Sequence, residues 1–170
     1  MINFGIIYGM SAYGLAQQLN IEPKIAQAYI DEYFKKVPGV QAYIEESLEE
    51  ARQKGYVTTL LQRRRYLPDI QSPTAAIRQA SERMAINTPL QGTAADIIKV
   101  AMIRIQSRFE ELRLSTKMIM QVHDELVFEV PEEEAQKALP MIQKEMEGVM
   151  ELSVPLRVSI QSGKNWAEVH

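Results

Sequence analysis

Apolar residues recur at three- and four-residue steps through the first third of the chain, which is the spacing of one face of an α-helix. Four segments show this spacing, and their ranges are 2–10, 11–19, 22–37 and 40–55. Ser11 can cap the second segment, Pro23 suits the first turn of the third, and Gly55 suits the end of the fourth. The expected inward face of the third segment is Ile25, Tyr29, Ile30, Tyr33 and Phe34. The sequence therefore predicts a helical first third.

A short hairpin is expected next. Residues 56–60 are rich in β-branched residues, and residues 66–67 are apolar and aromatic. A basic turn at residues 62–65 joins the two segments, and Pro68 closes the second.

Two helices are predicted after this hairpin. Ser72 and Thr74 offer caps for a helix running toward Met84. The segment 88–93 contains a proline and a glycine and should break the pattern, after which Thr93 can cap a long amphipathic helix. The inward stripe of that helix is expected to be Ile97, Ile98, Ala101, Met102, Ile105 and Phe109.

Two alternating apolar runs flank the ionisable residues His123, Asp124 and Glu125. The alternating residues are Met118, Met120 and Val122 before them, and Leu126, Phe128 and Val130 after them. A period of two predicts half-buried strands, here joined as a hairpin with the ionisable residues at its tip. A hairpin supports its tip rigidly, which suits a carboxylate that binds a metal ion. A solvated turn is the alternative interpretation.

The C-terminal part predicts one more helix and one more strand. Residues 132–134 are glutamates that suit the first turn of a helix, and Pro140 should kink or divide that helix. The alternation of Leu156, Val158 and Ile160 predicts a last strand. Helices dominate before residue 72, whereas helices and strands alternate after it. The sequence therefore predicts a mostly helical α+β fold that divides into residues 1–72 and 73–170.

Composition excludes several classes of site. The chain has no cysteine and only two histidines, His123 and His170. Disulfides and thiolate chemistry are therefore excluded, and both zinc sites and His-Asp phosphohydrolase sites lack ligands. No apolar stretch approaches the roughly 20 residues that span a bilayer, and the N-terminus does not resemble a signal peptide. We expect a soluble cytoplasmic chain.

The net charge of −3 conceals an uneven distribution. Residues 60–110 contain eight Lys and Arg against four Asp and Glu, whereas residues 111–170 contain six against eleven. The middle third is therefore where a polyanion is expected, and a solvated charged face is the alternative.

Two sets of side chains share a helical face through four-residue intervals. Phe4 and Tyr8 form the first set, for which burial in the core is the alternative to binding. Arg83, Asn87 and Gln91 form the second set, for which the alternative is a solvated polar stripe.

Four motifs occur together in this chain. They are residues 3–9, residues 55–59 with 63–69, residues 83–96, and residues 121–125. With this order and spacing, the chain from residue 2 to residue 170 resembles the C-terminal portion of the family A DNA polymerases. The resemblance implies template-directed DNA synthesis, in which a deoxynucleoside triphosphate (dNTP) donates a nucleotidyl group to a primer 3′-hydroxyl. Residues 1–72 would be a remnant of the fingers, and residues 73–170 the second half of the palm with its catalytic hairpin.

The resemblance also implies roles for individual residues. Asp124 would be a catalytic ligand of two Mg²⁺ ions, Glu125 would assist it, and His123 would position the primer end. Phe4 and Tyr8 would meet the incoming nucleotide. The contacts to primer–template DNA would be Arg83, Asn87 and Gln91 in the minor groove and Arg63, Arg64 and Arg65 at backbone phosphates.

The chain also departs from the family pattern. Gln62 stands where the family usually has glycine, and a turn with positive φ is awkward for glutamine. The family's triphosphate-binding arginine and lysine and its second metal-binding aspartate lie upstream, and Asp31, Asp69 and Asp96 lack the surroundings of that aspartate. We therefore expect an incomplete active site, completed by an N-terminal polymerase half.

A non-catalytic DNA-binding remnant is the alternative function. Because the hairpin would leave an open edge and an uncovered apolar face, we also expect weak stability or self-association.

Overall fold

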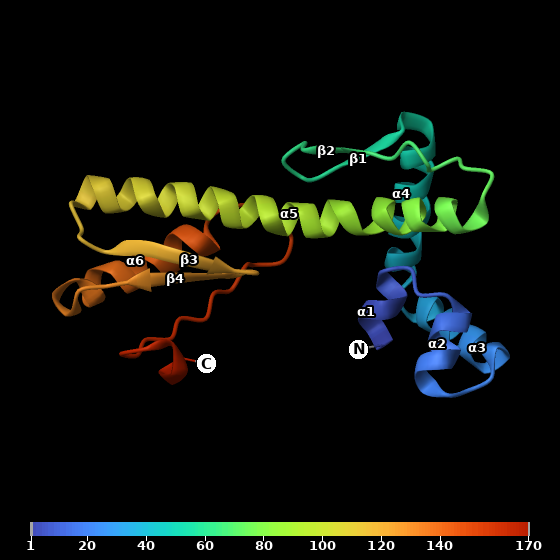
Figure 1. The fold of residues 1–170 in the computed structure, drawn as a ribbon, viewed down its shortest axis with the longest axis horizontal. Helices are drawn as coiled ribbons and strands as arrows, with labels where there is room; N and C mark the ends of the chain where they lie inside the picture. The colour runs from blue at the N-terminus through green and yellow to red at the C-terminus, as the bar shows by residue number, and fades with distance from the viewer. Residues whose placement is uncertain (1, 170) are drawn as a thin grey trace. The chain divides into compact units, whose positions relative to one another are not determined.

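The computed structural model describes residues 2–169, except the side chains of Ile2 and Phe4. The chain forms two compact units, Met1–Thr93 (unit 1) and Ala94–His170 (unit 2), whose elements are labelled in Figure 1. This division lies later in the chain than the boundary expected after residue 72. The assignment of residues 1–72 to fingers and 73–170 to palm stays a prediction. The mixture of long helices with small antiparallel sheets confirms the α+β class.

Unit 1 begins with four helices. They are α1 (Ile2–Ile7), α2 (Ala12–Leu19), α3 (Pro23–Lys36) and α4 (Pro38–Lys54). The predicted caps are confirmed, because the Ser11 hydroxyl accepts a hydrogen bond of 3.2 Å from the Gly14 N–H, and Gly55 ends α4 with a φ of 73°. A first core forms from Ile6, Leu15, Ala16, Ala26 and Ile30.

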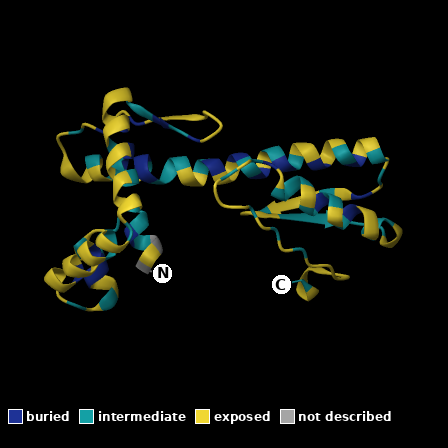
Figure 2. Cartoon of the chain, turned by 180° about the vertical axis from the view of Figure 1, so that it is seen from behind, coloured by how far each residue is buried: buried dark blue, intermediate teal, exposed yellow. Residues whose placement is uncertain are grey.

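The inward face predicted for α3 is partly wrong. Ile25 is 44% exposed and Tyr29 is 56% exposed, while Ala26 and Ile30 are buried. Figure 2 shows that exposed residues make up most of α3. Each residue turns the helix by about 100°, so Ile25 and Tyr29, which directly precede Ala26 and Ile30, lie on a different side of α3 from the buried residues. Small Ala26 lets α3 approach the core closely, and this places the larger neighbours outside.

A second core in unit 1 supports the first hairpin. Strands β1 (Tyr56–Thr58) and β2 (Arg64–Tyr66) pair antiparallel. The connection runs from Thr59 to Arg63 and so lies earlier in the chain than the basic turn predicted at residues 62–65, because Arg64 and Arg65 belong to β2. The core beneath it contains Ala51, Val57, Leu67, Ile70 and Ala85.

A single helix, α5 (Ala75–Leu112), contributes residues to both units, so the predicted break at residues 88–93 is wrong. Pro89 lies inside the helix and removes one backbone hydrogen bond, which costs about 3 kcal/mol. Buried residues before and after it, Ala85, Ile86 and Ile98, outweigh this cost. Within residues 2–169, no helix is long and apolar enough to span a membrane.

The core of unit 2 lies between α5, the second hairpin and α6 (Ala135–Glu147). The predicted stripe of α5 is confirmed for Ile97, Ala101, Ile105 and Phe109, whereas Met102 is half-buried and does not pack on this core. The buried residues of the core are Ala101, Ile105, Phe109, Ala138, Ile142 and Val149. The Phe109 and Phe128 rings meet edge to face with centroids 5.9 Å apart. A short 3-10 helix, η1 (Glu132–Glu134), precedes α6, and Pro140 does not divide α6. Pro140 is the sixth of the 13 residues of α6 and removes one backbone hydrogen bond, while the buried Ala138 and Ile142 on either side of it hold the helix against the core.

The second hairpin consists of β3 (Lys117–Val122) and β4 (Glu125–Glu129), as the alternation predicted. However, its register shifts between Met118 and Met120, which leaves Ile119 as a β-bulge. A bulge moves every later residue to the other face. Met118 therefore packs on the core, while Ile119 is 58% and Met120 45% exposed, so the prediction of one shared face for Met118 and Met120 is wrong. The apolar outer face is open in unit 2, and self-association stays a prediction.

The predicted last strand is wrong, because each sheet in residues 2–169 has only two strands and neither includes residues 156–160. Side chains of α6 bind this segment instead. The Val158 N–H donates to the Glu147 carboxylate at 3.0 Å, and the Val158 carbonyl accepts from the Gln143 amide at 3.3 Å. These bonds satisfy the backbone without a strand partner. A final 3-10 helix, η2 (Trp166–Glu168), follows.

Glu134 anchors the loop between α5 and β3, and this anchor should depend on pH. Its carboxylate accepts bonds from the Thr116 hydroxyl at 2.6 Å and from the N–H groups of Ser115 and Thr116 at 2.7 and 2.9 Å. The Thr116 hydroxyl and then the Ser115 N–H hold the pKa of Glu134 below its ordinary value. A depressed pKa gives stability that is present above the unfolded pKa of about 4.3 and is lost as pH falls through the folded pKa.

We therefore expect Glu134→Gln to lower the free energy of unfolding at pH 7 and to remove part of its decline below about pH 4.3. Urea unfolding of both proteins between pH 3 and pH 7 measures this, with Glu133→Gln as the matched control. Parallel pH profiles for wild type and Glu134→Gln would contradict the anchoring role.

Candidate nucleic-acid interface and metal-binding hairpin

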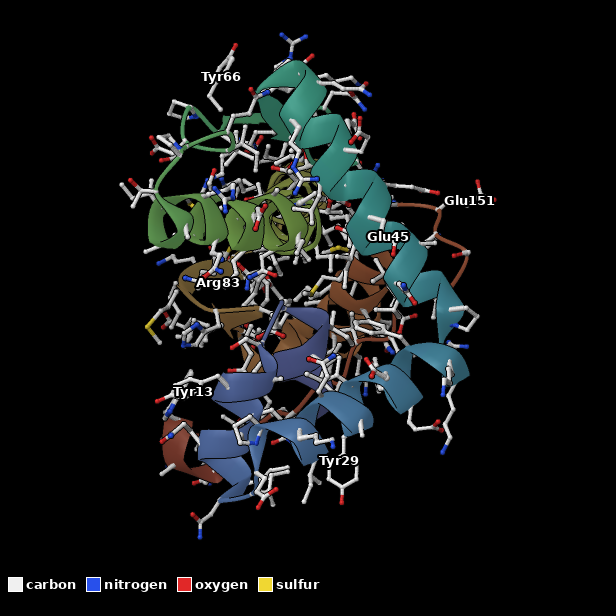
Figure 3. All side chains as sticks on the ribbon, turned by 90° about the vertical axis from the view of Figure 1, so that its right-hand side faces the viewer. Tyr13, Tyr29, Glu45, Tyr66, Arg83 and Glu151 are labelled. Atoms are coloured by element: carbon white, nitrogen blue, oxygen red, sulfur yellow. The ribbon has the colours of Figure 1, made fainter. Side chains whose placement is uncertain are left out.

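A depression of about 340 Å³ opens on the surface of unit 1 between β2 and α5. The helix contributes Arg83, Asn87 and Gln91 at four-residue intervals, and the strand contributes Arg65. Figure 3 shows Arg83 on the surface of α5. Ala80, Met84 and Thr88 complete the lining. The fold thus unites four of the six side chains that the sequence proposes as DNA contacts.

The arginines of β2 are held by specific neighbours. The Arg65 guanidinium donates to the Thr88 hydroxyl at 3.3 Å and contacts the Met84 sulfur at 3.0 Å. The Arg64 guanidinium carbon lies 4.8 Å from the centre of the Tyr56 ring, a cation–π arrangement. Arg63, Arg64 and Arg65 are all exposed. Their positive charge therefore lies at the surface of unit 1.

Asn87 is half-buried, and its side-chain oxygen is buried without a hydrogen-bond partner in residues 2–169. Buried polar atoms almost always have a partner, so this acceptor has unused capacity beside the depression. Thr88 and Met84 were not identified from the sequence. Their role depends on the approach of Arg65, which is distant in the chain.

Gln62 adopts a left-handed φ of 64° at the tip of the first hairpin. The turn therefore forms with glutamine in a conformation that favours glycine. Its N–H donates to the Thr59 carbonyl at 2.9 Å, which closes the turn.

The second hairpin presents the ionisable residues of unit 2. Val122 pairs with Glu125, so His123 and Asp124 form a two-residue loop, and His123 has a φ of 52°. The Gln121 amide donates to the His123 carbonyl at 3.0 Å and braces this loop. His123, Asp124 and Glu125 are exposed. The predicted hairpin tip is thus confirmed as a structure, while the catalytic roles of its residues stay predictions.

The hairpin tip fits one part of a magnesium site. Mg²⁺ binds through hard oxygen ligands, commonly one or two carboxylates together with substrate phosphates and waters. The exposed Asp124 carboxylate would supply one such ligand, a role that stays a prediction. Among residues 2–169, no three acidic or histidine side chains converge as a metal-binding group.

The two aromatic candidates differ in what the structure shows. The side chain of Phe4 lies outside the described residues, as does His170. Helix α1 ends at Ile7, so half-buried Tyr8 belongs to the following turn, and the prediction that it continues the helix is wrong. Gly9, with a φ of 82°, follows directly and favours the turn over another helical residue.

Comparison with known proteins gives one consistent result. The family described as "DNA polymerase family A" matches residues 1–168. The chain is 53% identical over 165 residues to DNA polymerase I of Bacillus caldotenax, covering 97% of this chain and 19% of that protein. It is 50% identical over 165 residues to the thermostable DNA polymerase I of Thermus aquaticus, covering 97% of this chain and 20% of that protein. The chain thus spans about a fifth of the length of these curated relatives.

A solved structure agrees with this result. The POL domain of Pol1 from M. smegmatis, in a complex with DNA primer-template and dNTP, superposes with a TM-score of 0.96 at 43% identity. The match covers 99% of this chain and 30% of that one.

Proposed function

Because the chain belongs to DNA polymerase family A, we propose that it forms one part of an active site for template-directed DNA synthesis. The reaction transfers a nucleotidyl group from a dNTP to the primer 3′-hydroxyl and releases pyrophosphate. The observation that carries the proposal is the exposed two-residue tip that presents Asp124 on a paired hairpin. A carboxylate fixed in this way suits the charge neutralisation on which phosphoryl transfer depends.

Unit 1 supplies the proposed DNA interface. Arg63, Arg64 and Arg65 bind backbone phosphates, which gives affinity without sequence preference. Arg83 and the amides of Asn87 and Gln91 contact the minor groove, where every base pair offers an acceptor at purine N3 or pyrimidine O2. Such contacts test the shape of a base pair without reading its sequence.

Unit 2 supplies the proposed catalytic residues. When bound, two Mg²⁺ ions neutralise the phosphate charge and lower the pKa of the primer hydroxyl. Asp124 contributes a carboxylate oxygen to them, Glu125 assists, and His123 positions the primer end. We assign Phe4 and Tyr8 to the incoming nucleotide on the family resemblance alone.

The remaining groups come from another polypeptide segment in this proposal. The second carboxylate and the cations that hold the triphosphate belong to an N-terminal polymerase half, which acts either in the same longer protein or in trans. The fivefold greater length of the relatives supports this division. Residues 1–72 then correspond to part of the fingers, and residues 73–170 to part of the palm.

A non-catalytic DNA-binding remnant is the second candidate. The observation in its favour is that no three potential metal ligands converge within residues 2–169. The two functions differ in one measurable way, because only a polymerase part restores synthesis when the other half is supplied.

Primer extension on a templated duplex with Mg²⁺ and all four dNTPs tests the proposal. We expect extension from the chain mixed with an N-terminal half of a family A polymerase, and none from either polypeptide alone. Duplex binding without extension in the mixture would favour the non-catalytic remnant.

A further inference from the structure

Beside the core around Val57 and Ala85, a buried polar contact joins the first hairpin to α5 within unit 1. Thr59 is 2% exposed and Thr93 is 7% exposed. The Leu60 N–H donates to the Thr93 hydroxyl at 3.0 Å, and the same hydroxyl donates to the Pro89 carbonyl at 2.5 Å. Thr93 therefore joins the hairpin backbone to the helix backbone. We call Thr59, Gly92 and Thr93 the hairpin dock.

Thr59 also ties together the connection that leads into β2. Its hydroxyl accepts from the Arg63 N–H at 3.1 Å, and its own N–H donates to the Arg63 carbonyl at 3.0 Å. Its carbonyl accepts from the Gln62 N–H. The position of Thr59 consequently fixes the backbone just before Arg64 and Arg65.

Gly92 sets how closely the hairpin approaches α5. A Cβ atom at position 92 would lie 2.6 Å from the Thr59 methyl carbon, closer than real Cβ atoms come to such a group. Thr59 cannot easily give way, because it is buried and β-branched, so its side chain has few allowed rotamers. Any larger residue at position 92 would push the hairpin away from the helix.

We propose that Gly92 and Thr93 are positioning residues, which hold Arg65 of the hairpin beside the Arg83–Asn87–Gln91 row of α5. The bond from Arg65 to Thr88, at 3.3 Å, lies one helical turn from the dock and depends on its spacing. The inference rests on the proposed function, since it concerns the geometry of the DNA interface. The inference adds Gly92 and Thr93 to the interface. Neither residue lines the depression, and both act by positioning Arg65.

Gly92→Ala tests the inference without removing any charged group. We expect it to weaken binding of the 170-residue chain to a fluorescein-labelled primer–template duplex about tenfold, and to reduce the slope of log K against log salt by about one, the contribution of one phosphate contact. Alanine favours helix over glycine, so a general loss of helix does not account for this result. The matched control is Gly39→Ala in α4, where the added carbon would meet no atom within 4 Å apart from its chain neighbours and the backbone of its own helix.

A rescue variant isolates the contact. Thr59→Ser removes the methyl group that the new Cβ would meet but keeps the hydroxyl that binds the Arg63 N–H. We expect Gly92→Ala with Thr59→Ser to recover most of the affinity and the salt slope. Thr93→Val should weaken binding like Gly92→Ala, while Thr93→Ser should retain it.

Amide hydrogen exchange at Leu60 separates this inference from the proposed function. The Leu60 N–H bonds to Thr93, so we expect its protection to fall in Gly92→Ala and to return in the double variant, with or without DNA. Wild-type affinity in Gly92→Ala, or failure of Thr59→Ser to rescue it, would overturn the inference. If the wild-type chain does not bind the duplex, the proposed DNA interface is refuted. Leu60 exchange then still decides whether Gly92 and Thr93 hold the hairpin against α5.

Discussion

Replacement of Asp124 by alanine is expected to reduce primer extension by the chain mixed with an N-terminal polymerase half by on the order of 10³-fold or more. The variant loses the hairpin carboxylate that we assign to the metal ions, so the phosphate charge is neutralised less well in the transition state. The hairpin itself should persist, because Asp124 is exposed and its loop is closed by the pairing of Val122 with Glu125. Single-turnover extension rates at saturating dNTP measure the loss.

The control for this variant is Glu133→Ala, which removes an exposed carboxylate elsewhere in unit 2. We expect near wild-type extension from the control, and duplex binding by both proteins. Extension by Asp124→Ala at the wild-type rate would exclude Asp124 as a metal ligand.

The second large effect concerns DNA affinity. Replacing Arg63, Arg64 and Arg65 together by alanine should weaken duplex binding on the order of 10²- to 10³-fold in low salt, because three phosphate contacts are lost. The slope of log K against log salt should fall by about 2.7, since each phosphate contributes about 0.9. Fluorescence anisotropy with a labelled duplex at several salt concentrations measures both quantities.

A charge-matched control distinguishes local contacts from net charge. Replacing Lys35, Lys36 and Lys54 by alanine removes the same charge from unit 1, at the ends of α3 and α4. We expect a much smaller change in affinity and slope from this control. Equal losses from the two triple variants would show that net charge, and not this interface, determines binding.

Helix caps, helix ends and strand periodicity in the sequence predicted the elements of this fold correctly where interactions between residues close in the chain determine the structure. The Ser11 cap and the Gly55 helix end depend on neighbouring residues only, and both formed as expected. The second hairpin followed from its period of two. Pro89 misled the prediction because burial on both sides of it exceeds its local cost. The bulge at Ile119 moved Met120 to the opposite face of β3 from Met118, and the pattern of apolar residues gives no sign of it.

The candidate site was predictable to a similar degree. The row of Arg83, Asn87 and Gln91 followed from four-residue intervals, which a continuous helix preserves. The position of Arg65 beside that row did not, because it depends on the contact of Thr59 with Gly92, which lies far along the chain. The wrong prediction of a strand around Val158 has a similar origin, since side chains of α6 bind the backbone groups that a strand partner would use.

Template-directed incorporation of a single nucleotide tests the central claim most directly. The chain is mixed with the N-terminal half, a primer–template duplex, Mg²⁺ and one dNTP at a time. We predict that the primer grows by one residue only with the dNTP complementary to the template base, and only when the chain with intact Asp124 is present. Duplex binding by the mixture with no incorporation of any dNTP, or incorporation that is equal without the chain, would contradict the account.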